Sequence, residues 1–372
     1  MESFLDYFLV SLPWFFNTEH MSYLDILNAV LTAEQKCEAV DNIQKRLQSI
    51  YDAYLSCIIK SSLRSEHSEL EEICDTIIQV VKLTEDGRSN VAQEKLHQLY
   101  FLGKNLERLR TVDIKEGTSL YRMRGAETYT QYTKETHCEM YHVPFELRYK
   151  ISGARYSVVG LPVFYISESV YGCWEEIKRK SLDYSNVALF KPTKSLKFVD
   201  MTLPNANHTI NEKRVKALPL ILASRLKVRH PDSANPPEYI IPQLVMNCVI
   251  QTRGNIYAGK NTLVGVRYES IHNNERDLLF TNRQRRNVFV NYAIPPFESK
   301  DSGICPVIKD LFEFWANTSW AEMRFRNPYQ FSSKEAPSSY NASVFGLIEE
   351  RLNLIPPGML TYTSLKGAAA LI

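Results

Sequence analysis

Apolar residues in the first third of the chain recur every three or four positions, which is the period of an amphipathic helix. Between Thr32 and Ile59 this stripe consists of Val40, Ile43, Leu47, Ile50, Tyr54 and Ile58. Thr32 and Gln35 have the spacing of a capping box, so we predict one helix over this stretch. Pro13 is the only proline before Pro144, so nothing in the sequence interrupts helices in this third.

Two further stripes follow the first. The second comprises Leu70, Ile73, Ile77 and Val80 and stops before the turn-like stretch Glu85–Ser89, and the third comprises Val91, Leu96, Leu99, Leu102 and Leu106. Amphipathic helices bury their apolar stripes against one another. The pattern therefore predicts a helical bundle over roughly the first 110 residues.

After Gly117 the pattern changes to short β-rich segments separated by turns and a few helices. The segments are Ser119–Met123, Leu161–Ile166, Val187–Phe190, Lys197–Val199, Leu244–Gln251 and Leu263–Tyr268. We predict an α+β protein: a helical N-terminal domain at residues 1–112, regulatory or oligomerising, and a second domain at 113–372 with a mixed sheet. Within the latter, Asp301–Asn317 is expected to be helical and the Ser-rich Phe331–Asn341 to be a loop.

Composition adds few constraints. The 372 residues are 44% hydrophobic and 23% charged with a net charge of +2, so we expect a folded chain with no global attraction to nucleic acid or membrane. Seven cysteines with no C-x-x-C pair favour a reducing cytoplasm. The apolar opening segment Met1–Thr18 lacks a basic start and carries Glu2 and Asp6, so we interpret it as a buried or docking segment.

Common catalytic motifs are absent, including the P-loop, the dinucleotide-binding glycine motif, H-E-x-x-H and G-x-S-x-G. No two histidines have the i, i+4 spacing of metal ligands, so we predict no metal site. His137, Cys138 and His142 could form a ligand cluster, but we favour the simpler interpretation of ordinary surface histidines in a polar loop.

Candidate chemistry is concentrated between Leu120 and Glu176. The segment begins Leu120-Tyr121-Arg122-Met123-Arg124, passes through Gly153-Ala154-Arg155-Tyr156-Ser157 and Leu161-Pro162-Val163-Phe164-Tyr165, and ends Ser167-Glu168-Ser169-Val170-Tyr171-Gly172-Cys173-Trp174-Glu175-Glu176. This order resembles the RES domain of NAD-degrading bacterial toxins. That family has an early Tyr-Arg strand, a Gly-Arg-aromatic-Asn/Ser turn, an apolar strand ending in Tyr, and a Glu eleven residues later. More weakly, the resemblance extends to about residue 300.

The resemblance implies a fold similar to that of ADP-ribosyltransferase toxins and a site for NAD. It assigns catalytic roles to Arg122 and Glu176, and substrate contacts to Arg155 and Tyr165 with the adjoining Tyr156 and Ser157. Two departures stand out: Met123 replaces a residue that is often polar or aromatic, and the family's Ser has no clear counterpart. Gln243 is our first candidate for that polar group, and Ser157 is the second.

These residue types also suit NAD on chemical grounds. Guanidinium groups such as Arg122 and Arg155 bind a pyrophosphate through paired hydrogen bonds. A carboxylate such as Glu176 can stabilise the oxocarbenium-like transition state that forms when the glycosidic bond breaks. The Tyr165 ring can stack on the cationic nicotinamide.

Each residue taken singly also has an ordinary structural interpretation. Arg122 could pair with an acid on the sheet, Arg155 could be exposed in a turn, and Tyr165 could be a half-buried strand residue. Glu175 and Glu176 point about 100° apart on a helix, so only one can face a given site. We choose Glu176 for its spacing and keep Glu175 in reserve.

The leading functional hypothesis is cleavage of the nicotinamide–ribose bond of NAD, either by phosphate, as in an NAD phosphorylase, or by water, as in an NAD glycohydrolase. Alternatives are an ADP-ribosyltransferase acting on a macromolecule and an inactive RES scaffold. We expect NAD as a substrate, with no bound cofactor. We also expect a homo-oligomer, an antitoxin or other inhibitory partner, and a role in toxin–antitoxin or phage defence.

Overall fold

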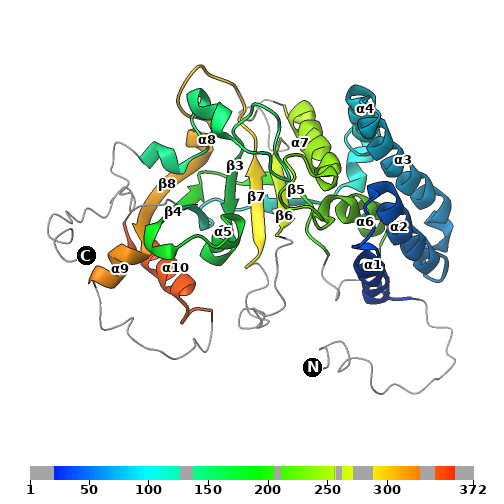
Figure 1. The fold of residues 1–372 in the computed structure, drawn as a ribbon, viewed down its shortest axis with the longest axis horizontal. Coiled ribbons are helices and arrows are strands. Elements are labelled where there is room, and N and C mark those ends of the chain that lie inside the picture. The colour runs from blue at the N-terminus through cyan, green and yellow to red at the C-terminus, as the bar shows by residue number, and fades with distance from the viewer. Residues whose placement is uncertain are drawn as a thin grey trace.

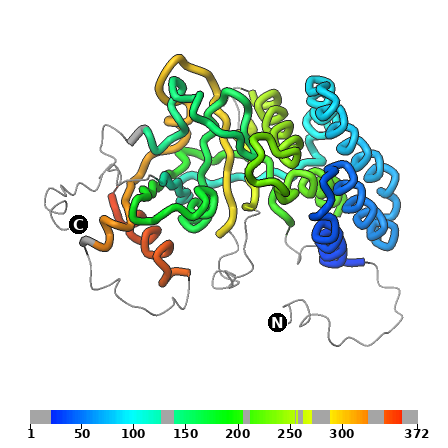
Figure 2. Tube along the Cα trace, in the orientation of Figure 1, coloured from blue at the N-terminus to red at the C-terminus, as the bar shows by residue number. Residues whose placement is uncertain are grey.

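The computed structural model describes residues 21–125, 137–204, 211–254, 256, 262–270, 288–326 and 340–356. In this part of the chain a central sheet has a group of N-terminal helices toward one edge and shorter helices toward the other (Figures 1 and 2). The predicted segment Met1–Thr18 and all but two residues of Phe331–Asn341 lie outside the described residues.

The N-terminal region is helical, as predicted. Its elements are α1 (Tyr23–Cys37), α2 (Ile43–Ile59), η1 (Arg64–Glu66), α3 (His67–Glu85), α4 (Ser89–Tyr100) and η2 (Gly103–Arg108). The single helix predicted for Thr32–Ile59 is wrong, because the chain breaks between Cys37 and Ile43. The Asn42 side chain accepts a hydrogen bond from the Lys45 N–H and starts α2, and the actual capping box lies at Ser22 and Asp25.

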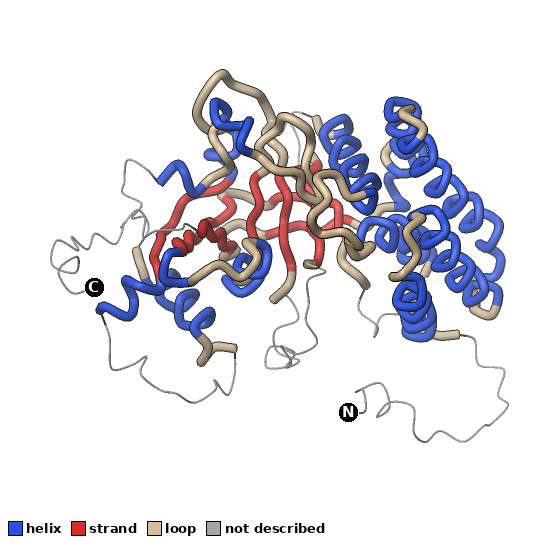
Figure 3. Tube along the Cα trace, in the orientation of Figure 1, coloured by secondary structure: helices blue, strands red, loops and turns tan. Residues whose placement is uncertain are grey.

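Eight strands form one mixed sheet with the order β1-β5-β6-β7-β3-β2-β4-β8. In chain order they are β1 (Thr111–Ile114), β2 (Leu120–Gly125), β3 (Phe164–Ser167), β4 (Ser185–Pro192), β5 (Leu196–Asp200), β6 (Leu263–Glu269), β7 (Val290–Ile294) and β8 (Phe312–Ser319). The β5–β6 pair is parallel, and the other pairs are antiparallel. The predicted α+β class with a mixed sheet is confirmed (Figure 3).

Helices and turns of the 3₁₀ type connect the strands. They are η3 (His137–Met140), η4 (Phe145–Lys150), α5 (Val170–Glu176), η5 (Leu182–Tyr184), α6 (Glu212–Arg225), η6 (Pro237–Tyr239), α7 (Ile240–Thr252), α8 (Pro306–Leu311), α9 (Trp320–Arg326) and α10 (Val344–Leu354).

Two predictions for this part of the chain are wrong. Leu244–Gln251 belongs to helix α7, because a short apolar run reads the same in a buried strand and a buried helix. Helix α8 ends at Leu311 within the helix predicted for Asp301–Asn317, and the residues after it form β8 on β4. Pairing with a long neighbouring strand outweighs a local helical pattern in the sequence.

Two helical layers pack on one face of the sheet. Val266, Tyr268 and Ala293 pack with α1–α4, α6 and α7 in one core cluster. Tyr121 and Met123 pack with α5 and α10 in another. Strand alternation and register place Tyr165, Ser167, Tyr268 and Asn291 on this same face.

The N-terminal helices share their core with α6, whose proline they accommodate. Pro219 lies inside α6 and has no N–H, so the Val215 carbonyl loses its helical donor. The hydroxyl of buried Tyr54 donates to this carbonyl at 2.8 Å. The helices of residues 21–108 therefore complete the bonding of α6 as well as covering it.

Tyr54→Phe is expected to lower the free energy of unfolding by about 1 to 3 kcal/mol, because it leaves a buried carbonyl without a donor. Chemical denaturation monitored by circular dichroism measures the loss. Tyr51→Phe is the matched control. The Tyr51 hydroxyl donates to the Pro219 carbonyl at 2.9 Å. In a regular helix this carbonyl also faces the N–H four residues later, so it keeps a donor in the variant. Equal losses in the two variants would contradict this account.

His142 is fully buried, so its interpretation as a surface histidine is wrong. Its Nδ1 lies 2.7 Å from the Val143 carbonyl, and its Nε2 accepts the Cys305 N–H at 2.9 Å. Both ring nitrogens are thus engaged by the backbone and a neutral ring satisfies both contacts. Burial lowers the pKa of His142 from 6.5 to about 4.

We expect stability to fall as the pH drops from 6.5 toward 4, because the unfolded chain then binds a proton that the folded chain does not. The contribution of His142 is about 3 kcal/mol over this range. Denaturation curves at several pH values measure it, and His142→Gln, which offers both an acceptor and a donor, should flatten the dependence. The exposed-residue control His230→Gln should leave the slope of unfolding free energy against pH unchanged. If His142→Gln also leaves this slope unchanged, His142 is excluded as its source.

Candidate active site

Helix α5 is held tightly against the end of β3. The Ser169 side chain caps the helix by accepting the Gly172 N–H at 2.8 Å. A Cβ on Gly172 would lie 2.4 Å from Ser167 Oγ and 2.8 Å from the Val288 carbonyl, so only glycine permits this approach. The short β3–α5 connection therefore fixes where the last residue of α5, Glu176, is placed.

Glu176 lies against β7, on the face that carries Asn291. Its Oε1 accepts a hydrogen bond from Asn291 Nδ2 at 2.8 Å in a part-buried contact, although the residue as a whole is exposed. Desolvation by the surrounding protein nevertheless raises its pKa, while the Ser270 hydroxyl and the Arg155 charge act in the opposite direction. A carboxylate that protein surrounds, on a residue that is itself exposed, is well suited to meet a ligand.

Glu175 has a different environment. It is buried and forms an ion pair with Arg179, with a distance of 2.8 Å between Nη2 and Oε1. Arg179 also stacks on the Trp174 ring, and its φ of 54° places it in the left-handed region at the end of the helix. Of the two neighbouring acids, Glu175 anchors this turn, and Glu176 faces Arg155 and the tyrosines described next.

Four tyrosines surround the Glu176 side of the site. Tyr165 on β3 is half-buried, and within the described residues its buried hydroxyl has no hydrogen-bond partner. The Tyr156 and Tyr268 rings pack together with centroids 4.8 Å apart. Burial raises the pKa of Tyr165, Tyr239 and Tyr268, and the nearby Glu176 charge adds to the increase in each.

Arg155 approaches this group from the turn before β3. Its Nη1 and Nη2 donate to the carbonyls of Ser224 and Leu226 at 2.9 and 3.0 Å, where α6 ends. Its Cζ lies 5.1 Å from the centre of the Tyr239 ring. Arg155 is therefore partly buried and held in place, rather than being a free turn residue, and its charge reaches Glu176.

Arg122 approaches Tyr165 differently from the other candidates. Strand alternation sends its side chain to the face of Leu120, opposite Tyr121. Its Nη1 donates to the Tyr165 carbonyl at 2.6 Å, and its Cζ lies 5.5 Å from the Phe164 ring. The structure thus brings Arg122 to the backbone of Tyr165, whereas Glu176 lies near its phenol.

The two candidates for the family's serine contact each other. Gln243 on α7 donates to Ser157 Oγ and to the Ala154 carbonyl, both at 3.4 Å. Ser157 also donates to the Ala154 carbonyl at 2.8 Å. Both side chains thus tie the turn that carries Arg155 to α7.

Sequence reasoning missed Tyr239, Tyr268, Ser270 and Asn291. Tyr268 and Ser270 occur two positions apart at the end of a predicted strand, a spacing that puts side chains on one face. That alternation could have indicated them. Nothing local distinguishes Asn291 or Tyr239, since each reaches the site only through the fold.

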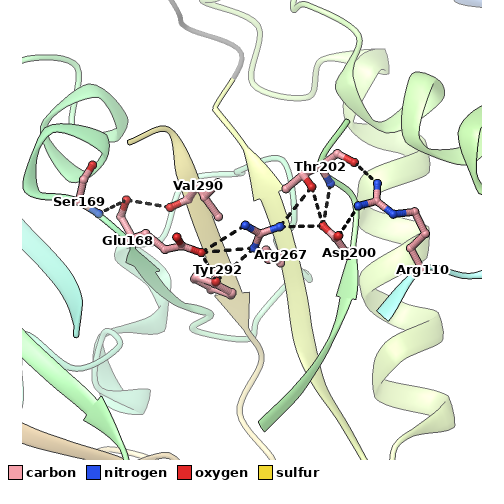
Figure 4. Close-up of polar contacts among 9 residues, drawn as sticks. Arg110, Glu168, Ser169, Asp200, Thr202, Arg267, Val290 and Tyr292 are labelled. Carbon is pink, nitrogen blue, oxygen red and sulfur yellow. Dashed lines mark hydrogen bonds and ion pairs between the residues drawn. The ribbon is translucent and has the colours of Figure 1, made fainter. Parts of the chain in front are cut away.

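A charged network links the strands beneath the site (Figure 4). Arg267 on β6 lies 3.2 Å from Asp200 Oδ1 and 3.4 Å from Glu168 Oε1, and the Tyr292 hydroxyl donates to the same Glu168 oxygen. Arg110 binds the other oxygen of Asp200 at 2.6 Å. Because Glu168 directly precedes the cap of α5, this network also fixes the connection that positions Glu176.

Among the described residues, no group of three or more histidines, cysteines or acids is arranged to hold a metal ion. The same residues include no helix that is long and apolar enough to cross a membrane.

Comparison with known proteins identifies this region. Residues 119–300 match the family model described as the RES domain, which confirms the resemblance seen in the sequence. The chain is also similar to a protein of Bacillus subtilis (strain 168) named "Putative toxin YopC", with 25% identity over 327 residues, which cover 80% of this chain and 69% of the relative. No solved structure matches the chain.

Proposed function

We propose that this protein is a toxin that cleaves the bond between nicotinamide and ribose in NAD. The observation that carries the proposal is the placement of Glu176 beside Tyr165 and Arg155 within the RES domain. The name of the B. subtilis relative adds support for the toxin role. NAD enters as a substrate, and no bound cofactor is required.

Cleavage of the nicotinamide–ribose bond requires little proton transfer. Nicotinamide leaves as a neutral molecule with the electron pair of the broken bond, and positive charge develops on the ribose. The Glu176 carboxylate stabilises that charge, and its bond from Asn291 keeps it oriented. The Tyr165 hydroxyl, which lacks a hydrogen-bond partner in the described part of the chain, offers a hydrogen bond to the ligand, since buried polar groups normally have a partner.

Arg155 supplies positive charge for the pyrophosphate, and Arg122 holds the Tyr165 carbonyl from the opposite face of the sheet. Two donors of Arg155 already bind backbone carbonyls, and these bonds fix the plane of its guanidinium group. Gln243, Ser157 and Tyr156 support the turn that carries it. The acceptor at the ribose carbon is phosphate or water.

The biological setting follows from this reaction. Cleavage of free NAD would deplete the cytoplasmic pool, which suits a toxin–antitoxin or phage-defence system. Such an activity requires restraint, so we expect an inhibitory protein partner, and we expect the chain to form homo-oligomers.

The test is to incubate the purified protein with NAD, with and without phosphate, and to identify the products by mass spectrometry. Release of nicotinamide with ADP-ribose indicates a glycohydrolase, and release with phosphorylated ADP-ribose indicates a phosphorylase. Nicotinamide release that depends on an added protein acceptor would identify an ADP-ribosyltransferase. Intact NAD under all conditions would overturn the proposal and favour a non-catalytic scaffold.

A further inference from the structure

The N-terminal helices reach the candidate site through one buried arginine. Arg46 on α2 is 1% exposed, and its Nη1 lies 2.7 Å from Oε1 of Glu238, which is 3% exposed. Its Nη2 donates to the Lys227 carbonyl at 3.0 Å. Burying two charges costs about as much as their attraction returns, so such a pair contributes geometry more than stability.

The two segments that Arg46 joins are the two that hold Arg155. Lys227 follows Leu226, whose carbonyl accepts a hydrogen bond from Arg155. Glu238 precedes Tyr239, whose ring faces the Arg155 guanidinium. The buried guanidinium of Arg46 thus fixes the distance between the Leu226 carbonyl and the Tyr239 ring. These two groups hold the guanidinium of Arg155.

A second N-terminal contact acts on the same place. Glu34 on α1 forms an ion pair with Arg225, with a distance of 2.7 Å between Oε2 and Nη1. Arg225 stands between Ser224 and Leu226, the two residues whose carbonyls Arg155 binds. Both α1 and α2 therefore hold the end of α6 where Arg155 is anchored.

We propose that Arg46 is a positioning residue for the NAD site, acting on Arg155 through Leu226 and Tyr239. The inference rests on the proposed function. This role would make the N-terminal helices part of the structure that supports the site, so their contribution does not require a separate regulatory movement. It also means that a single substitution tests their role better than deletion, which would uncover the core that they share with α6 and α7.

Arg155 is assigned to the pyrophosphate, which does not react, so its displacement weakens the substrate and transition-state complexes alike. We expect Arg46→Met to raise KM for NAD on the order of tenfold and to change kcat by less than about twofold. Equilibrium titration with NAD should show the same loss of affinity. In an Arg155→Ala background, adding Arg46→Met should raise KM no further, because the residue through which it acts is gone.

Tyr54→Phe is the matched control, since it weakens the same helical region at the other end of α6. It should leave KM unchanged. Arg46→Lys keeps the charge but cannot bind Glu238 and the Lys227 carbonyl with one planar fork, so it should raise KM by a smaller factor and serves if Arg46→Met fails to fold.

The outcomes separate this inference from the proposed function. Wild-type protein that neither binds nor cleaves NAD overturns both. A wild-type protein active on NAD, with unchanged KM in the folded Arg46 variant, overturns only the role of Arg46. So does an equal rise of KM in Tyr54→Phe, or full additivity with Arg155→Ala.

Discussion

Glu176→Gln is expected to lower kcat for NAD cleavage by about 10²- to 10³-fold without loss of the fold. Glutamine has the same size, and its amide oxygen can still accept the hydrogen bond from Asn291. It lacks the negative charge that opposes the cation developing on the ribose. Nicotinamide release at saturating NAD measures the change, and thermal unfolding checks the fold.

The neighbouring residue provides the control. Glu175→Gln removes the charge that holds Arg179, so we expect lower stability. The folded protein should retain cleavage activity because Glu175 is buried in the turn. Full activity in a well-folded Glu176→Gln variant, or loss of activity in a well-folded Glu175→Gln variant, would refute the assignment of Glu176.

The part of the site that the sequence predicted best is the part that the chain builds locally. Tyr165 and Glu176 are joined by the end of β3, the Ser169 cap and helix α5, whose last residue is Glu176. All of these are readable from strand alternation, a capping serine and helix period. The eleven-residue spacing of Tyr165 and Glu176 therefore reflects a single β–α connection.

The remainder of the site depends on contacts between distant segments. Arg155 binds carbonyls 69 and 71 positions later, and Asn291 reaches Glu176 across 115 positions. No local pattern encodes such partners. For the same reason the sequence could not show that Gln243 and Ser157 bind each other, or that Glu175 pairs with Arg179 in a buried turn.

Errors in the predicted elements also have physical causes. A stripe continues in phase across residues 38–42, so only the capping side chain of Asn42 marks the start of a new helix. In α7 seven of the thirteen residues are buried and only Gln251 is exposed, so the helix has almost no polar face to distinguish it from a strand. Periodicity is informative for elements with one exposed face and fails for those enclosed by the fold.

Arg122→Ala is expected to reduce NAD cleavage by about 10²-fold, because it removes both a positive charge and a brace on β3. Among the described residues, β2 and β3 share one register pair, Tyr121 with Ser167. The bond from Arg122 to the Tyr165 carbonyl holds the strands together beyond that pair. Steady-state kinetics with NAD, together with an unfolding curve, measures the effect.

Two conservative variants separate the charge from the brace. Arg122→Lys keeps the charge, and Arg122→Gln keeps a donor for the Tyr165 carbonyl. Recovery in the lysine variant alone would mean that the charge acts on the pyrophosphate, and recovery in the glutamine variant alone would mean that Arg122 positions Tyr165. Arg124→Ala, two positions along the same strand, should retain most activity. Wild-type kinetics in a folded Arg122→Ala protein would remove Arg122 from the site.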